Sequence, residues 1–344
     1  METVMTGFVR AAALDDLRRR GYLTAQLGGQ PVALFYHQDR VYAVDNRCPH
    51  MGFPLDRGTV RDGILTCHWH HARFDLESGG TFDQWADDVR AFPVEVRDGE
   101  IYVDPSPRRD QAAHQRQRLQ IGLERDLSLV IGKAVLALMD AGPAGLEAFR
   151  DGLAFGTRYR GMGWGQGLTM HVCMMNLLPT LRAEDRPRAL YHGLSAVARD
   201  TAGRTPHFGV PPLPGDSGDL PTLKRWFRQF VEVRDAEGAE RCIVSAIRAG
   251  ANDRQMADML FAAVTDHRYI DIGHPADFTN KAFEALDIAG WDLAEPVLSS
   301  LVNGYANASR MEESNAWRYP VDLIALLDQA FEQLPAAVAQ GEQR

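Results

Sequence analysis

Two short cysteine–histidine pairs constrain the fold of this chain more than any other feature of its sequence. One residue separates Cys48 from His50, two residues separate Cys67 from His70, and sixteen residues lie between the pairs. A glycine and a proline follow the first pair, two glycines follow the second, and these residues favour tight turns. The spacing therefore predicts two separate loops, each of which carries one thiol and one imidazole.

Two thiolates and two imidazoles on separate loops are the ligands of a [2Fe-2S] cluster in which the cysteines hold one iron and the histidines hold the other. Zinc accepts the same ligand types in tetrahedral sites. Zinc fingers usually place both histidines on one helix, whereas each loop here contributes one cysteine and one histidine. The arrangement favours the cluster over zinc and over plain buried thiols, and its ligands would be Cys48, His50, Cys67 and His70.

The sequence around these loops resembles the Rieske ferredoxin-like domain. The resemblance runs from Phe8 to about residue 105, and it includes the segments Val41–Asn46 and Ile101–Val103. It implies a mostly antiparallel β domain with a [2Fe-2S] cluster that carries one electron at a time. Local patterns agree with this expectation, because residues 32–36 read as a strand, residues 14–21 as one short helix, and Asp98-Gly99 as a hairpin turn.

The residues beside the ligands indicate the kind of Rieske domain that the chain resembles. Rieske proteins of respiratory complexes tie their ligand loops with a disulfide, and Phe53 and Trp69 occupy the corresponding positions here. Those proteins also follow the last ligand with a Gly-Ser pair that raises the potential, where this chain has His71 and Ala72. We therefore expect a potential toward the low end of the Rieske range of about −150 to +300 mV. His68 and His71 are expected to shape and solvate the loop, with proton transfer or partner docking as the alternative.

The character of the sequence changes near residue 105. Residues 106–118 contain almost no apolar side chains, so we expect an exposed linker between a Rieske [2Fe-2S] domain over 1–105 and a second domain over 119–340. The linker arginines are expected to be solvated, with docking of an acidic redox partner as the alternative; they are Arg108, Arg109, Arg116 and Arg118.

Beyond Leu119 apolar residues recur at i, i+3, i+4 and i+7, which is typical of helices. The predicted fold class is a mainly-β Rieske-type iron–sulfur domain followed by an all-α helical array. Helices are predicted over residues 146–155, 189–197, 223–231, 256–264, 278–288, 294–301 and 321–334. The segment from Thr205 to Pro221 interrupts this pattern with five prolines, and a loop of that length is often functional.

Composition and charge argue against several classes of protein. A formal charge of −9 over 344 residues disfavours nucleic-acid binding. No basic region followed by an apolar stretch begins the sequence, and its most apolar run, residues 127–139, is interrupted by Lys133. We therefore expect a cytoplasmic protein that does not enter a membrane. Cys173 and Cys242 are expected to be plain buried thiols.

The helical half offers one weak constellation of its own. His267, Asp271 and His274 would share one face of a continuous helix, and two imidazoles with a carboxylate are a ligand set for non-haem iron. The competing interpretation is that Gly273 and Pro275 end the helix before His274. His192 is a further candidate, with a satisfied core histidine as its alternative.

These features predict an iron–sulfur oxidoreductase that receives electrons from a reductase or ferredoxin. On the leading hypothesis the cluster feeds a small-molecule substrate or a second non-haem iron in the helical half, as in an oxygenase. The alternative is a ferredoxin component whose helical domain docks a separate reductase or oxygenase. Ring-hydroxylating oxygenases follow their Rieske domain with a mixed α/β iron-binding domain, and the second half of this sequence shows neither its strands nor its histidine–carboxylate segment.

Overall fold

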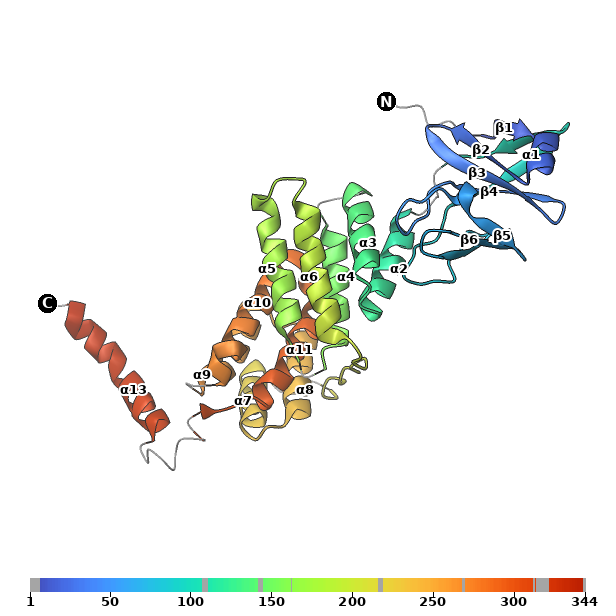
Figure 1. Cartoon of the computed structure of the whole chain (residues 1–344). Helices are drawn as coiled ribbons and strands as arrows, with labels where there is room; N and C mark the ends of the chain where they lie inside the picture. Colours follow the sequence, from blue (N-terminus) through green and yellow to red (C-terminus); the bar gives the residue numbers. More distant parts are fainter. Residues whose placement is uncertain are drawn as a thin grey trace. The chain divides into compact units, whose positions relative to one another are not determined.

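The computed structural model describes residues 7–106, 111–141, 145–161, 163–215, 219–267, 270–311, 313 and 322–342. The chain divides into two compact units (Figure 1). The first unit runs to Ile121 and also takes in Leu127–Ala134, and the second comprises Gly122–Asp126 and the chain from Val135 onward.

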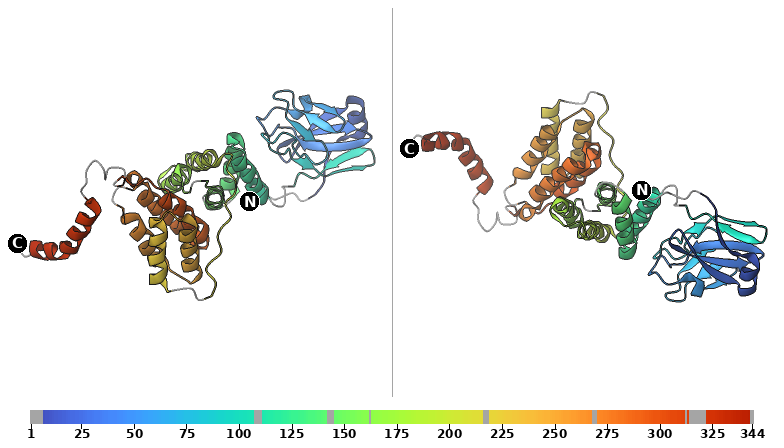
Figure 2. Two further views of the ribbon diagram at one scale, coloured as in Figure 1. Left: turned by 90° about the horizontal axis from the view of Figure 1, so that it is seen from below. Right: turned by 90° about the horizontal axis from the view of Figure 1, so that it is seen from above.

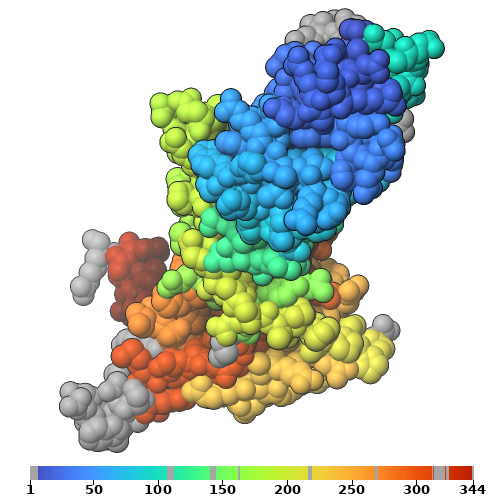
Figure 3. All heavy atoms as spheres, turned by 45° about the vertical axis from the view of Figure 1, so that its right-hand side comes forward, coloured from blue at the N-terminus to red at the C-terminus, as the bar shows by residue number. Residues whose placement is uncertain are grey.

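Antiparallel strands build the first unit, as the Rieske resemblance implies. Within the described residues they form three sheets, with the strand orders β1-β10-β9, β2-β3-β4-β8 and β5-β6-β7. The strands are β1 (Val9–Ala13), β2 (Tyr22–Leu27), β3 (Gln30–His37), β4 (Arg40–Asp45), β5 (Thr59–Arg61), β6 (Ile64–Thr66), β7 (Arg73–Asp75), β8 (Ala91–Phe92), β9 (Val94–Arg97) and β10 (Glu100–Val103). Figure 3 shows one face of this unit, in dark to light blue, as a closely packed surface.

Turn residues set the ends of these elements where the sequence predicts them. Helix α1 (Leu14–Arg20) ends at Gly21, which adopts a φ of 79° that glycine enters without strain. Asp98 and Gly99 both have positive φ, 50° and 78°, and join β9 to β10. The predicted helix and hairpin turn are therefore confirmed.

Helices make up the second part of the chain, as the periodicity predicts. They are α2 (Gln111–Glu124), α3 (Ser128–Ala141), α4 (Leu146–Arg158), α5 (Gln166–Leu177), α6 (Arg186–Thr201), α7 (Leu220–Glu232), α8 (Ala236–Arg248), α9 (Asp253–Thr265), α10 (His274–Ala289), α11 (Ala294–Ala306) and α13 (Leu323–Glu342), with short 3-10 turns η1 (Leu55–Arg57), η2 (Leu178–Thr180), η3 (Asp271–Gly273) and η4 (Trp291–Leu293). Within the described ranges, none of these helices combines the length and apolar character needed to cross a membrane.

Capping side chains and close packing define the helical unit. The Asp219 carboxylate accepts a hydrogen bond from the Thr222 amide at the start of α7 (2.9 Å), and Asn252 and Gln255 form a capping box at the start of α9. Helices α5 and α6 lie side by side along their length (Figure 1), and Figure 2 shows the helical unit from below and from above.

One expectation for residues 106–118 is wrong. Helix α2 begins at Gln111, and Arg118 is only 5% exposed because it forms an ion pair with Asp87 at 2.9 Å. The Arg118 guanidinium also donates to the carbonyl oxygens of Gln84 (3.2 Å) and Ala86 (2.5 Å). A segment with few apolar residues is exposed only if its charged side chains find no partners in the folded protein, and Arg118 finds several. Arg108 and Arg109 lie outside the described residues.

Candidate metal centre

The first ligand loop follows β4 and closes on itself around Cys48. The Cys48 N–H donates to the carbonyl oxygen of Phe53 (2.8 Å), and the Gly52 N–H donates to the carbonyl oxygen of Cys48 (2.7 Å). Gly52 has a φ of 84°, which favours glycine. These bonds fix the short segment that carries His50.

The second ligand loop repeats this pattern between β6 and β7. The Cys67 N–H donates to the carbonyl oxygen of Ala72 (2.8 Å), and the His71 N–H donates to the carbonyl oxygen of Cys67 (3.0 Å). His71 thus holds the position that Gly52 holds in the first loop, and its φ is 63°. A side chain in this left-handed conformation costs of order 1 kcal/mol. The backbone conformation favours the interpretation in which His71 shapes the loop.

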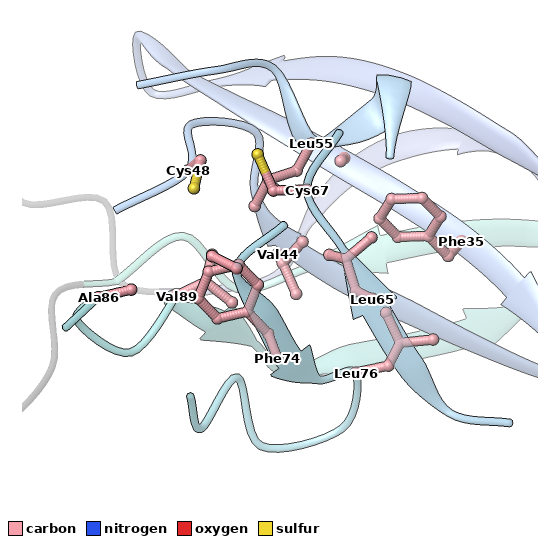
Figure 4. Packing of buried hydrophobic residues seen from close by; sticks show 12 residues of the cluster. Phe35, Val44, Cys48, Leu55, Leu65, Cys67, Phe74, Leu76, Ala86 and Val89 are labelled. Carbon is pink, nitrogen blue, oxygen red and sulfur yellow. The ribbon is translucent and has the colours of Figure 1, made fainter. Parts of the chain in front are cut away.

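Both cysteines of the loops belong to the apolar core of the first unit. Cys48 is 3% and Cys67 1% exposed, and Figure 4 shows them next to each other at one end of a cluster that includes Val44, Leu55 and Phe74. Burial raises the pKa of the Cys48 thiol to about 11, because the charged form is desolvated. The thiol therefore stays protonated until a metal ion displaces the proton.

The two imidazoles of the ligand loops lie next to each other, with their rings nearly perpendicular. The ring centroids of His50 and His70 lie 4.8 Å apart, and the Trp85 ring lies 4.7 Å from that of His50. Burial lowers the pKa of His50, and the neighbouring His70 and Lys133 lower it further, which favours the neutral form that binds metals. Nδ1 of His50 is buried and has no hydrogen-bond partner.

The four residues fit a [2Fe-2S] cluster of the Rieske type. A buried nitrogen without a partner is uncommon in folded proteins, and coordination to a metal would satisfy it. The neighbouring thiols are free as well, since all four cysteines of the chain lie among the described residues and none forms a disulfide. The structure thus brings together the ligand types that the spacing predicts.

An aromatic contact joins the two loops where respiratory Rieske proteins have a disulfide. The ring centroids of Phe53 and Trp69 are 6.0 Å apart, and Trp69 also contacts the ring of His70 at 4.7 Å. Aromatic pairs at such distances stabilise by about 0.5–1.5 kcal/mol beyond their buried area. The loops are therefore tied by packing.

Lys133 contacts the first ligand loop, a contact that the sequence did not predict. Its Nζ donates to the carbonyl oxygen of His50 (2.6 Å), and this part of α3 belongs to the first unit. Burial lowers the pKa of Lys133, although Asp87 and Cys48 oppose the shift. The interruption of the apolar run at residues 127–139 by this lysine was the available signal.

The candidate residues in the helical half do not lie on one helix face, so that prediction is wrong. Helix α9 ends at Thr265, Asp271 begins the 3-10 turn η3, and His274 is the first residue of α10. The chain breaks here because Gly273 adopts a φ of 92° and a proline follows His274. Nε2 of His267 is paired with a carboxylate oxygen of Glu232 at 2.7 Å.

The described residues of the helical half contain no group of three or more metal-ligand side chains close to one another. His192 is exposed on α6 and contacts the ring of Tyr191, so it is not a core histidine either. Among the described residues, a single group of three or more His, Cys, Asp or Glu side chains has ligand atoms that all lie within 4.8 Å of one another, and it lies in the first unit: Asp87, Asp88 and His114. His114 and Arg118 both pair with the Asp87 carboxylate. Burial alone would raise the pKa of Asp87, but these two partners outweigh burial and the pKa is lowered. This group holds α2 in place.

Comparisons with known proteins agree with the metal centre. Residues 7–93 match the family model of the Rieske [2Fe-2S] domain. The ferredoxin component of the alkene monooxygenase system of Xanthobacter autotrophicus is 30% identical over 108 residues, which are 30% of this chain and 88% of that protein. The 3-phenylpropionate/cinnamic acid dioxygenase ferredoxin subunit of Photorhabdus laumondii is 35% identical over 77 residues, which are 22% of this chain and 73% of that protein.

A solved structure is also similar to a part of the chain. The ferredoxin of carbazole 1,9a-dioxygenase from Nocardioides aromaticivorans is 32% identical, and the match covers 29% of this chain and all of that one, with a TM-score of 0.28. The family model covers residues 7–93, and the helical part of the chain is of unassigned family.

Proposed function

The chain belongs to the Rieske [2Fe-2S] domain family through residues 7–93, and we propose that it transfers electrons through a cluster held by Cys48, His50, Cys67 and His70. The observation that carries this proposal is the buried, unpartnered Nδ1 of His50 beside two buried free thiols. When bound, such a cluster accepts and releases one electron at a time.

The chain's own residues would adjust this chemistry. The backbone N–H groups of His50 and Met51 donate toward the Cys48 sulfur and favour its thiolate, against the larger effect of burial. The same donors would stabilise the negative charge that an added electron brings. The His70 ring is exposed, so solvent protons or a partner protein reach it directly.

The surroundings of the histidines support the ferredoxin alternative. Met51 is 54% and Trp69 51% exposed, and Trp85 beside His50 is exposed as well. Exposed apolar side chains next to a redox centre fit a transient protein interface. We infer that this face meets a separate redox protein, such as a reductase that donates electrons or an oxygenase component that accepts them. The relatives named as ferredoxin components of oxygenase systems support this inference.

The oxygenase-like hypothesis has less support than the ferredoxin alternative. It requires a small-molecule substrate or a second non-haem iron in the helical half, and the predicted ligands there are dispersed over α6, the residues after α9, η3 and the start of α10. Oxidoreductase activity of the chain alone and its cytoplasmic location stay predictions.

The experiment is an iron and acid-labile sulfide analysis of anaerobically purified protein, with EPR spectroscopy of the dithionite-reduced sample. We expect about two irons and two sulfides per chain and a Rieske-type signal. Cys67→Ser should lose both iron and sulfide. Cys242→Ser is the matched control, because Cys242 is a buried thiol of α8 whose pKa burial raises to about 11.

Two other outcomes would change the proposal. Iron without sulfide would contradict the cluster assignment. Iron in clear excess over sulfide would support a second iron site in the helical half, provided that the excess is lost in His267→Ala and kept in Cys242→Ser.

A further inference from the structure

A cavity of about 300 Å³ lies within the second unit, among α4, α8, α11 and the segment between α6 and α7. The proline-rich interruption at residues 205–221 contributes His207 and Gly209 to its wall. This volume lies at the lower end of the range of about 300–1,000 Å³ for ligand pockets. It corresponds to the liquid volume of about ten water molecules, at ~30 Å³ each.

A buried arginine on this wall has more hydrogen-bond donors than partners. The Arg160 side chain is 4% exposed, and its Nη2 contacts the Oε1 (3.2 Å) and Oε2 (3.1 Å) atoms of Glu240. Among the described residues, no other group bonds to this guanidinium, and its Nε and Nη1 atoms keep access to solvent, where a ligand could meet them.

The electrostatics of this arginine also favour a further anion. Nε2 of His207 lies 3.1 Å from Oε1 of Glu240, so Glu240 serves two cationic or polar partners at once. Burial lowers the pKa of Arg160 even though Glu240 opposes the shift. The desolvation of the guanidinium is therefore not fully compensated, and a carboxylate would match its planar set of donors.

A buried hydroxyl on α11 points to the same conclusion from a different element. Ser299 lines the cavity and is 3% exposed, and its Oγ has no hydrogen-bond partner. Buried helix hydroxyls nearby bond to their own backbone instead: Thr157 Oγ1 donates to the Leu153 carbonyl (2.9 Å), and Ser300 Oγ to the Val297 carbonyl (2.6 Å). Buried polar atoms are normally hydrogen-bonded, so a buried hydroxyl without even this local bond indicates a partner from outside the chain.

The remaining wall supplies apolar surface and one spare positive charge. Val244, Pro296 and Ala154 contribute apolar atoms. Glu295 is paired with Arg248 at 2.7 Å, whereas Arg158 lies exposed at the cavity with no carboxylate partner among the described residues. The balance favours a ligand with one negative charge and an apolar body.

We propose that this cavity binds a small organic monocarboxylate of about ten non-hydrogen atoms. Arg160 holds the carboxylate, and Ser299 bonds a polar atom of the ligand. The site lies entirely in the second unit and depends on neither the cluster nor the electron transfer proposed above.

The test is isothermal titration calorimetry on the full-length protein. The probes are benzoate, cyclohexanecarboxylate and hexanoate, each compared with its neutral amide. At least one carboxylate should saturate a single site and bind roughly tenfold more tightly than its amide. Ser299→Ala should weaken that binding by roughly three- to tenfold. Ser300→Ala is the matched control, since this neighbouring buried serine is bonded to its own helix, and it should change binding by less than about twofold.

A second variant guards against a structural effect of the first. Arg158→Gln changes only an exposed side chain. It should weaken the binding of the carboxylate and leave the binding of its amide unchanged. The proposal is overturned if none of the three carboxylates saturates, if the amides bind equally well, or if binding survives unchanged in both Ser299→Ala and Arg158→Gln.

Discussion

Lys133 is the residue through which α3 reaches the first ligand loop. Its Nζ donates to the carbonyl oxygen of His50, and this helix lies beyond the segment that matches the Rieske family. A reduced cluster carries one more negative charge than an oxidised one, so a nearby ammonium group favours the reduced state. The lysine should therefore raise the reduction potential.

Replacing Lys133 by methionine should lower the potential of the cluster by tens of millivolts. A loss of roughly 1 kcal/mol corresponds to about 40 mV for a one-electron couple. The measurement is an EPR-monitored redox titration, with Lys133→Arg expected to stay near the native value. Lys224→Met is the control, because Lys224 lies on α7 and pairs with Asp258. A native potential in a fully loaded Lys133→Met protein would contradict this role.

The contrast between the ligands and Lys133 shows what local sequence encodes. The cysteine–histidine pairs are short-range patterns, because each loop closes between residues five apart, as in the bond from Cys48 to Phe53. The contact between Lys133 and His50 joins residues 83 positions apart. No spacing rule connects them, so only tertiary packing reveals the pair.

At the scale of elements, glycine sets how closely α5 and α6 approach. A Cβ atom on Gly193 of α6 would lie 2.7 Å from Nδ1 and 2.9 Å from the Cα of His171 on α5. The second of these is a backbone atom, so the contact cannot be relieved by a side-chain rotation. The two helices pack at this distance only because residue 193 has no side chain.

Gly193→Ala should lower the free energy of unfolding by about 1–3 kcal/mol, because it overpacks this interface. Gly304→Ala is the matched control on α11, where a Cβ atom would meet nothing within 4 Å. There the gain in helix propensity should raise the free energy of unfolding by about 0.4–1 kcal/mol. Urea unfolding followed by far-ultraviolet circular dichroism measures both. Equal effects of the two variants would contradict the close-approach argument.

Apolar periodicity predicts where helices lie, whereas their ends depend on capping residues and on the backbone conformation beyond the last turn. The predicted segment 223–231 lies inside α7, whose actual start is fixed by Asp219, a capping residue outside the apolar pattern. The predicted common face of His267, Asp271 and His274 ignores the positive φ of 56° at Ile272 and 92° at Gly273. Periodicity reports which residues are buried and does not report where the backbone leaves the helix.

At the scale of the whole molecule, one buried histidine links stability to pH. His171 is fully buried, its Nε2 lies 3.0 Å from the carbonyl oxygen of Phe149, and its Nδ1 has no partner. Burial lowers its pKa to about 4, against the smaller effect of the Phe149 bond. The folded protein thus excludes the imidazolium form, which the unfolded chain accepts below about pH 6.5.

The sign of the pH effect follows from proton binding. Above about pH 6.5 His171 is neutral in both states, and the free energy of unfolding is at its highest with respect to this group. As the pH falls toward about 4, the unfolded chain binds the proton and the folded chain does not, so stability is lost. Carboxylates whose pKa is lowered by a partner, such as Asp83 beside Arg73, also contribute to the free energy of unfolding. That contribution is lost only as the pH falls below about 4.

His171→Gln should therefore flatten the pH dependence between about 6.5 and 4, where the native protein loses up to about 3 kcal/mol more than the variant. The glutamine amide keeps a donor for the Phe149 carbonyl and carries no titratable group. Chemical unfolding at about pH 7, about pH 5.5 and about pH 4.5 gives the slopes to compare. His192→Gln is the control, because it makes the same change at an exposed position of α6. Parallel slopes for native and His171→Gln proteins would show that the buried imidazole is not the group that couples protons to folding.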